Sequence, residues 1–154
     1  MEKIIWVDYA LCTGCETCRL VCSYNKEGIF WPSLARIKLW REKDQGQVYP
    51  LTCKQCASPP CADACLMNII TKDPVSGVNI RETEMCIGCR ACQAACPFDA
   101  GVYHLQQDIV VSCDTCQGEP VCVKFCPHQA LAFTDLDEMK RKKQKKRAEQ
   151  SIVV

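Results

Sequence analysis

The chain has 154 residues and a formal net charge of +1, and hydrophobic residues make up 48% of it, so its length suits one compact domain. Sixteen residues are cysteines, whereas only four are phenylalanines. This composition excludes an ordinary hydrophobic core, because groups bound by the thiols must replace much of the apolar filling. No apolar run approaches the length of a membrane span, so we expect none.

The N-terminus and the cysteine content together indicate a compartment. The apolar run Ile4 to Val7 is too short for a signal peptide, and the acidic residues Glu2 and Asp8 flank it. In the reducing cytoplasm, thiols stay available to bind metals instead of forming disulfides. We therefore expect a cytoplasmic protein whose cysteines are metal ligands.

Short strands and turns are predicted between the cysteines. Residues 3–9 form a first strand, and residues 23–32 an irregular link. Three β-hairpins follow, because short apolar runs flank turn signals. Their strands are residues 34–41 with 47–52, 68–71 with 78–81, and 102–105 with 109–112; a last strand is predicted over 131–133.

The sixteen cysteines form four groups of four, and none is left over. Groups one and three share the spacing C-x-x-C-x-x-C-x-x-x-C, whereas groups two and four have four and five residues between their second and third cysteines. Proline follows directly after groups three and four, at Pro97 and Pro127. In order, the groups are Cys12, Cys15, Cys18 and Cys22; Cys53, Cys56, Cys61 and Cys65; Cys86, Cys89, Cys92 and Cys96; and Cys113, Cys116, Cys122 and Cys126.

This spacing predicts four 4Fe-4S clusters. In bacterial ferredoxins, three thiolates of such a run bind one cluster and the fourth binds another, so the groups must work in pairs, although the spacing alone leaves the partners open. Zinc is the alternative, but zinc knuckles usually stand a dozen or more residues apart, whereas each group here places four thiols within 11 to 14 residues. We therefore expect an α+β fold that duplicates the bacterial two-cluster ferredoxin, with short β-hairpins between the cysteine loops and a basic C-terminal helix or arm.

Group three shows how neighbouring residues are expected to serve a cluster. Gly88 lets the backbone pass close to the cluster without a Cβ in the way. Arg90 is the one charged side chain within the group, whereas group four holds Asp114 and Glu119 against Lys124. Positive charge stabilises the reduced cluster, so the cluster on group three is expected to be the easier of the two to reduce.

The C-terminal segment, residues 135–154, differs in charge from the rest of the chain. Residues 139–150 contain seven of the nineteen basic residues and one acid, which leaves 12 basic and 17 acidic side chains in residues 1–138. The segment lacks interleaved aromatic residues, so we expect no nucleic-acid binding. It is predicted to be a docking arm for a partner subunit or a second copy of this chain, with a solvated tail as the alternative.

No catalytic constellation accompanies the cysteines. The chain has no glycine-rich phosphate loop and no paired nucleophile and base. Of the two histidines, His104 and His128, the second follows Cys126-Pro127 and is expected to be an ordinary packed surface residue, with donation to a cluster sulfur as the alternative. The sequence thus predicts a protein that moves electrons for an enzyme and is not one itself.

With all four groups placed, residues 3–134 resemble the four-cluster iron-sulfur subunits of molybdenum and tungsten pterin oxidoreductases. The small size and the complete cysteine set are most similar to the electron-transfer subunit of tungsten aldehyde oxidoreductase complexes. The chain departs from many members at Cys116-Gln-Gly-Glu-Pro-Val-Cys122, which is shorter than the usual loop and points away from the dimethyl sulfoxide reductase branch.

The resemblance implies which cysteines share a cluster. Residues 1–134 then form one four-cluster domain, in which groups one and four make one ferredoxin-like half and groups two and three the other. Cluster one takes Cys12, Cys15, Cys18 and Cys126; cluster two takes Cys113, Cys116, Cys122 and Cys22; cluster three takes Cys53, Cys56, Cys61 and Cys96; and cluster four takes Cys86, Cys89, Cys92 and Cys65.

The resemblance also implies a function. The subunit would relay electrons between a tungsten or molybdenum pterin subunit that oxidises aldehydes and a flavin or NAD-linked subunit, or a ferredoxin. The alternatives are a free polyferredoxin, or the electron-transfer subunit of a carbon monoxide dehydrogenase, a hydrogenase or a formate dehydrogenase. A zinc-bound interaction protein is the alternative from another class.

Overall fold

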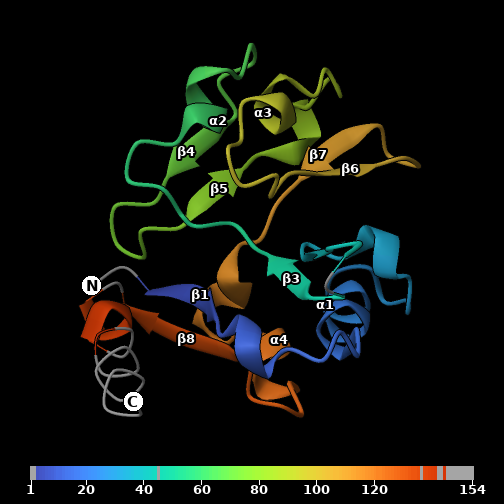
Figure 1. Ribbon diagram of the computed structural model, residues 1–154. Helices are drawn as coiled ribbons and strands as arrows, with labels where there is room; N and C mark the ends of the chain where they lie inside the picture. Colours follow the sequence, from blue (N-terminus) through green and yellow to red (C-terminus); the bar gives the residue numbers. More distant parts are fainter. Residues whose placement is uncertain (1–2, 45, 136, 142–143, 145–154) are drawn as a thin grey trace, which may run out of the picture.

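The computed structural model describes residues 3–44, 46–135, 137–141 and 144. Short helices alternate with two-stranded antiparallel sheets (Figure 1), which confirms the α+β class and the hairpins predicted from the sequence. The elements in chain order are β1 (Lys3–Val7), η1 (Tyr9–Leu11), α1 (Thr17–Glu27), η2 (Pro32–Leu34), β2 (Lys38–Arg41), β3 (Val48–Leu51), α2 (Pro60–Asp63), β4 (Ile70–Lys72), β5 (Asn79–Arg81), η3 (Thr83–Met85), α3 (Ala91–Ala94), β6 (Val102–His104), β7 (Ile109–Val111), η4 (Thr115–Gly118), α4 (Val121–Lys124) and β8 (Leu131–Asp135).

The first and last strands of the chain form one sheet. β1 pairs antiparallel with β8, and Ile5 stands opposite Phe133. Ile5 and Val7 are buried beneath this sheet, and each such side chain contributes about 1.5–3 kcal/mol of hydrophobic free energy. The pairing, which the sequence analysis did not predict, joins the chain before group one to the chain after group four.

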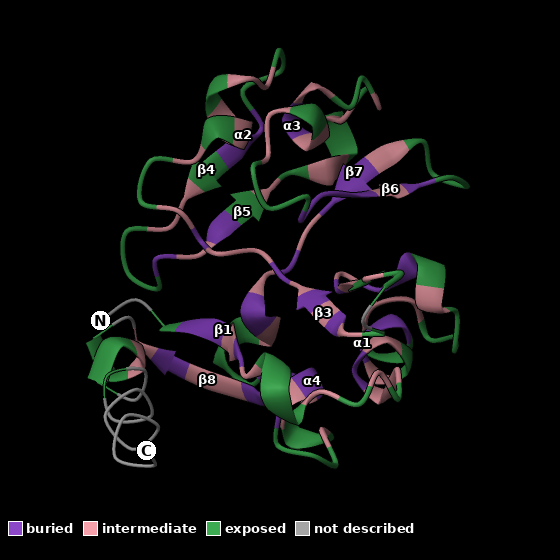
Figure 2. Ribbon diagram, in the orientation of Figure 1, coloured by how far each residue is buried: buried purple, intermediate pink, exposed green. Residues whose placement is uncertain are grey.

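The elements gather into two halves, one above the other in Figure 1. In the lower half α1 packs on α4 beside the β1–β8 sheet, and in the upper half α2 packs on α3. Each half has its own buried core (Figure 2), and cysteines belong to both cores. The lower core contains Ile5, Val7, Cys18, Cys22, Ala35, Ile37, Cys113, Cys122 and Leu131, and the upper core contains Ile69, Ile70, Cys92 and Val110.

Helix α1 corrects the prediction of an irregular link after Cys22. The helix continues through Ser23 to Glu27 and ends at Gly28, whose backbone is left-handed with φ +72°. The Gly28 N–H closes the last turn on the Tyr24 carbonyl at 2.8 Å. A glycine in this position is the common helix C-cap, so the end of the helix was readable in the sequence.

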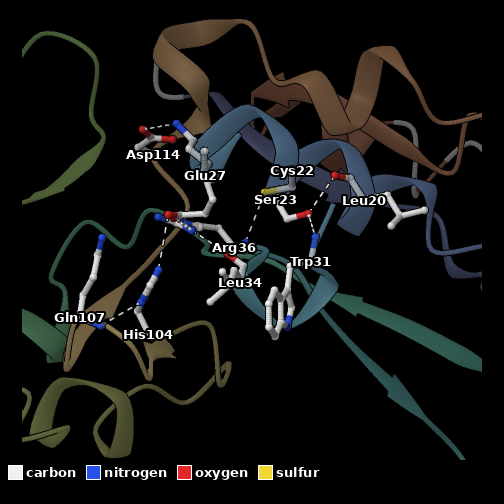
Figure 3. Close-up of polar contacts among 11 residues, drawn as sticks. Leu20, Cys22, Ser23, Glu27, Trp31, Leu34, Arg36, His104, Gln107 and Asp114 are labelled. Atoms are coloured by element: carbon white, nitrogen blue, oxygen red, sulfur yellow. Dashed lines mark hydrogen bonds and ion pairs between the residues drawn. The ribbon is translucent and has the colours of Figure 1, made fainter. Parts of the chain in front are cut away.

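A network of charged and polar side chains joins the two halves (Figure 3); within it His104 is buried, and Glu27 and Arg36 are half-buried. Glu27, at the end of α1, pairs with Arg36 through Oε1 at 2.5 Å. Its Oε2 lies 3.4 Å from Nε2 of His104, which β6 supplies from the upper half and which is only 2% exposed. The Gln107 N–H donates to Nδ1 of the same ring at 3.3 Å, so a neutral His104 carries its proton on Nε2, toward Glu27.

Replacing Glu27 by glutamine is expected to destabilise the joint between the halves. The change keeps the shape of the side chain but leaves Arg36 without its counter-charge. The Arg36 and Glu27 side chains are only 11% and 15% exposed. The free energy of unfolding should therefore fall by about 3 kcal/mol, the loss that is typical when a buried ion pair is broken. The urea concentration at which visible absorbance is lost would fall.

The control is Asp99→Asn, which removes another ion pair between the halves. Lys38 and Asp99 pair at 2.6 Å but are 27% and 62% exposed. An exposed pair contributes about 0–1 kcal/mol, so this variant should resemble the unmodified protein. If both variants lost their absorbance at the same urea concentration, the Glu27 network would stabilise the protein no more than the exposed Lys38–Asp99 pair does.

The C-terminal segment is described only in part. Residues 137–141 and 144 are helical, and the Glu138 N–H donates to Oδ1 of Asp135 at 2.7 Å. Most of the predicted basic arm, including residues 142–143 and 145–154, lies outside the described residues, so the arm and its docking role stay predictions. Within the described ranges, no helix combines the length and apolar character needed to cross a membrane.

Candidate iron-sulfur cluster sites

The four cysteine groups share one local backbone pattern. The residue directly before the second cysteine is left-handed in each, at Gly14, Gln55, Gly88 and Thr115, with φ of +71°, +47°, +66° and +58°. The third cysteine then lies in a short helix, α1 to α4 in turn. A left-handed glutamine or threonine costs about 1–2 kcal/mol, and such strain is typical of functional sites.

Gly88, which was expected to leave room for a cluster, also leaves room for the backbone of a neighbouring hairpin. A Cβ added at Gly88 would collide with the backbone carbonyl of Asp108, in the turn between β6 and β7. Asp108 is itself held by the hydroxyl of Tyr103, which donates to its carboxylate. The hairpin after group three therefore already requires glycine here, apart from any approach to a cluster.

Group one and the last cysteine of group four meet at one hollow. Cys12, Cys15, Cys18 and Cys126 all line it, and Cys126 comes from the other end of the chain. Burial raises the pKa of the Cys18 thiol to about 12, and the nearby Cys15, Cys12 and Cys126 add to the rise. His128, exposed as predicted, lies at the same hollow.

Group three forms a second hollow with the last cysteine of group two. Cys86, Cys89, Cys92 and Cys65 line it together with Ile69, Ile70 and Val110 of the upper core. As at the first hollow, three thiols come from one group and one from another. This is the arrangement in two-cluster ferredoxins, where three thiolates of a group bind one cluster and the fourth binds the other.

The remaining eight cysteines lie close to one another in two further sets. Burial raises the pKa of the Cys122 thiol, and Cys113, Cys22 and Cys116 act in the same direction, as does Cys18 of the first hollow. Burial likewise raises the pKa of Cys53, and among its neighbours Cys61, Cys56 and Cys96 add to the rise. These neighbourhoods match the remaining two ligand sets that the resemblance implies.

The donor chemistry fits iron-sulfur clusters. The sixteen cysteines, all within the described residues, form no disulfides. Buried thiols with raised pKa stay protonated until a metal supplies positive charge, so loading a site would release protons. Among the described residues no His, Cys, Asp or Glu group suits a single metal ion. The thiolates of a 4Fe-4S cluster bind four different irons and so stand further apart than the ligands of one ion.

Several N–H groups also point at the sulfurs, as hydrogen bonds that tune iron-sulfur potentials do. The Arg36 N–H donates to Sγ of Cys22 at 3.3 Å, and the Ala100 N–H to Sγ of Cys96 at 3.4 Å. The Asn25 side chain donates to Sγ of Cys116 at 3.7 Å, a long contact.

Sequence reasoning missed the arginine that touches a thiol. Arg90 was expected to act on the group-three cluster; it lines the same hollow, with its guanidinium stacked on the Tyr103 ring, 3.5 Å from the ring centre. Arg81 of β5 also lines this hollow, and it donates to Sγ of Cys92 at 3.1 Å and to Ser112 Oγ at 2.8 Å. Arg81 lies outside every cysteine group, so the motif carried no signal for it.

Comparisons with known proteins agree with this chemistry. A 4Fe-4S dicluster domain model matches residues 45–136, and a 4Fe-4S binding domain model matches residues 9–25. The chain is 40% identical to the polyferredoxin-like subunit of aliphatic sulfonate oxidoreductase from Pyrococcus furiosus, over 84% of this chain and 75% of that protein. It is 32% identical to a subunit of the anaerobic dimethyl sulfoxide reductase of Haemophilus influenzae, over 89% of this chain and 76% of that protein. The short loop at Cys116–Cys122 thus does not separate the chain from that branch.

Two further comparisons are partial or concern the fold alone. The beta subunit of NADH-dependent phenylglyoxylate dehydrogenase from Aromatoleum evansii is 35% identical over 80% of this chain but only 28% of its own length. The solved active-site complex BamBC of benzoyl coenzyme A reductase with zinc is 24% identical, with a TM-score of 0.50 over 93% of this chain and 88% of that one, and shares the fold. With its cysteine sites, matched domains and relatives, the chain belongs to the 4Fe-4S dicluster family of ferredoxin-type iron-sulfur subunits, which transfer electrons in oxidoreductase complexes and have no catalytic site of their own.

Proposed function

We propose that this chain binds four 4Fe-4S clusters and relays electrons through a cytoplasmic oxidoreductase complex. Four complete sets of thiols support the count: two line hollows, and two are neighbouring sets in the same structure. Each set follows the ligand assignment given above for clusters one to four. When bound, such a cluster accepts and releases one electron at a time, and the protein sets its potential through charge, hydrogen bonds and burial.

The proposal rests chiefly on the four thiol sets, and the order in which they follow one another supports a path. Cys18 of cluster one acts on the pKa of Cys122 of cluster two. Cys53 of cluster three likewise acts on Cys113 of cluster two, and Cys92 of cluster four on Cys61 of cluster three. Neighbouring sites in the order one, two, three, four favour a linear path from one end of the subunit to the other.

A path with two ends needs a partner at each end. At one end we place a pterin subunit that contains tungsten or molybdenum and oxidises an aldehyde. At the other we place a flavin or NAD-linked subunit, or a ferredoxin. The names of the relatives, subunits of sulfonate, dimethyl sulfoxide and phenylglyoxylate oxidoreductases, support a catalytic partner but not one substrate.

Purification of the native complex tests this proposal. A tag on the chain should recover a large subunit with tungsten or molybdenum, and the chain itself should contain about 16 iron atoms, four for each cluster. Recovery of the iron-loaded chain alone, at every salt concentration, would instead support a free polyferredoxin. Zinc in place of iron would overturn the proposal altogether.

A further inference from the structure

The chain crosses between the two halves at two places, and a cysteine group begins at each. After β3 the chain passes into the upper half, and after β7 it returns to the lower half (Figure 1); Cys53 and Cys113 are the first cysteines after these two strands, and both pack in the lower core. Cys113 is buried, which raises the pKa of its thiol to about 12, and Cys53 is close enough to add to this rise. Under the ligand assignment proposed above, these two cysteines serve clusters three and two.

Gln55 connects the two crossings. It lies in the loop between Cys53 and Cys56, is 2% exposed and has a left-handed backbone with φ +47°. Its Nε2 donates to the backbone carbonyl of Cys113 at 2.8 Å. Its Oε1 accepts from the Asn79 N–H, also at 2.8 Å, so both ends of the amide are fixed.

The hydrogen bonds of Gln55 are not needed merely to hold the two halves together. The Glu27 network and the Lys38–Asp99 pair also link the halves. Glutamine at a left-handed position has a conformational cost that glycine avoids at the matching positions Gly14 and Gly88, whereas Thr115 of group four has the same cost. At Gln55 this strain occurs where the side chain reaches across to a cluster ligand.

We propose that the Gln55 side chain is the hydrogen-bonded bridge through which electrons cross between clusters two and three. From Sγ of Cys56 to Sγ of Cys113 the path follows covalent bonds except for one 2.8 Å hydrogen bond, and tunnelling decays less steeply through bonds than through empty space. One electron leaves one site and one arrives at the other, with no bond broken and no proton moved. Gln55 thereby positions the path and is not itself oxidised or reduced. The inference depends on the proposed four-cluster function.

The test is Gln55→Met in the full chain, reconstituted with iron and sulfide. Methionine has a similar length but forms neither hydrogen bond. After flash photoreduction, freeze-quench electron paramagnetic resonance should show the electron redistributing between clusters two and three several-fold more slowly. The equilibrium potentials should stay unchanged, which separates a slower path from a smaller driving force, and amide exchange at Asn79 should rise because its acceptor is gone.

Gln93→Met is the matched control. The Gln93 amide also donates to a backbone carbonyl, that of Gly101 at 3.3 Å, but within the upper half. Its loss should leave the redistribution rate unchanged. If Gln55→Met fails to keep its iron, Gln55→Asn retains a buried amide that is one methylene too short to reach both partners, and the same slowing is expected.

An unchanged rate in a fully loaded Gln55 variant would overturn the bridge, because electrons would then pass directly between Cys53 and Cys113. Equal slowing in the Gln93 control would also overturn it. Failure of the proposed function looks different: the unmodified chain would then lack four iron-sulfur signals before any variant is made.

Discussion

Cys65→Ala is expected to damage cluster four, which sits on Cys86, Cys89 and Cys92, and to spare the cluster on its own neighbours Cys53, Cys56 and Cys61. Cys65 lines the hollow formed by group three, although it lies in group two along the chain. Loss of one of four thiolates leaves one iron without its protein ligand, so this cluster should convert to a three-iron form or be lost.

Mössbauer or paramagnetic resonance spectra of the loaded chain measure the effect. The variant should lose about one quarter of the 4Fe-4S signal, because one of four proposed clusters is affected. Cys96→Ala is the matched control, since it is the last cysteine of group three and should damage the cluster on group two. Damage confined to the mutated group in either variant would contradict the exchange of the fourth ligand.

The four cysteine groups are recognisable in the sequence because their chemistry is local, whereas the assignment of ligands to clusters stays a prediction. Three ligands of each proposed site lie within ten residues along the chain, and the left-handed residue and short helix that orient them belong to the same motif. The hairpins were equally readable, since alternating residues and turn signals are local patterns too. The end of α1 was readable as well, from Gly28, but was missed.

What could not be predicted depends on contacts between distant parts of the chain. The pairing of β1 with β8 spans residues 3 to 135, and neither strand's pattern identifies its partner. Glu27 and His104 meet across the two halves, and each looks like an ordinary surface residue in the sequence. Counting charges within a cysteine group leaves out partners from elsewhere in the chain: Asp114 pairs with Lys26 of α1 at 2.6 Å, so the predicted order of the two potentials stays a prediction.

Arg81→Met is expected to make cluster four harder to reduce. Arg81 donates to Sγ of Cys92 at 3.1 Å, and its positive charge also opposes the burial that raises the pKa of Cys61, a proposed ligand of cluster three. A donor and a positive charge both stabilise the reduced, more negative cluster. If the two redox states differ by about 1.4 kcal/mol in this interaction, the potential falls by about 59 mV for one electron.

A site-resolved redox titration measures this shift, and Arg90→Met is its matched control. Arg90 lies within the same cysteine group and lines the same hollow, but its guanidinium stacks on Tyr103. Removing Arg90 should shift the potential of cluster four much less, because no hydrogen-bond donor to a sulfur is lost. Cluster three should shift in the same direction in the Arg81 variant, by a smaller amount, since Arg81 acts on Cys61 through charge and not through a described hydrogen bond. A larger shift from Arg90 than from Arg81 would mean that charge near the group, and not contact with the sulfur, sets the potential of this cluster.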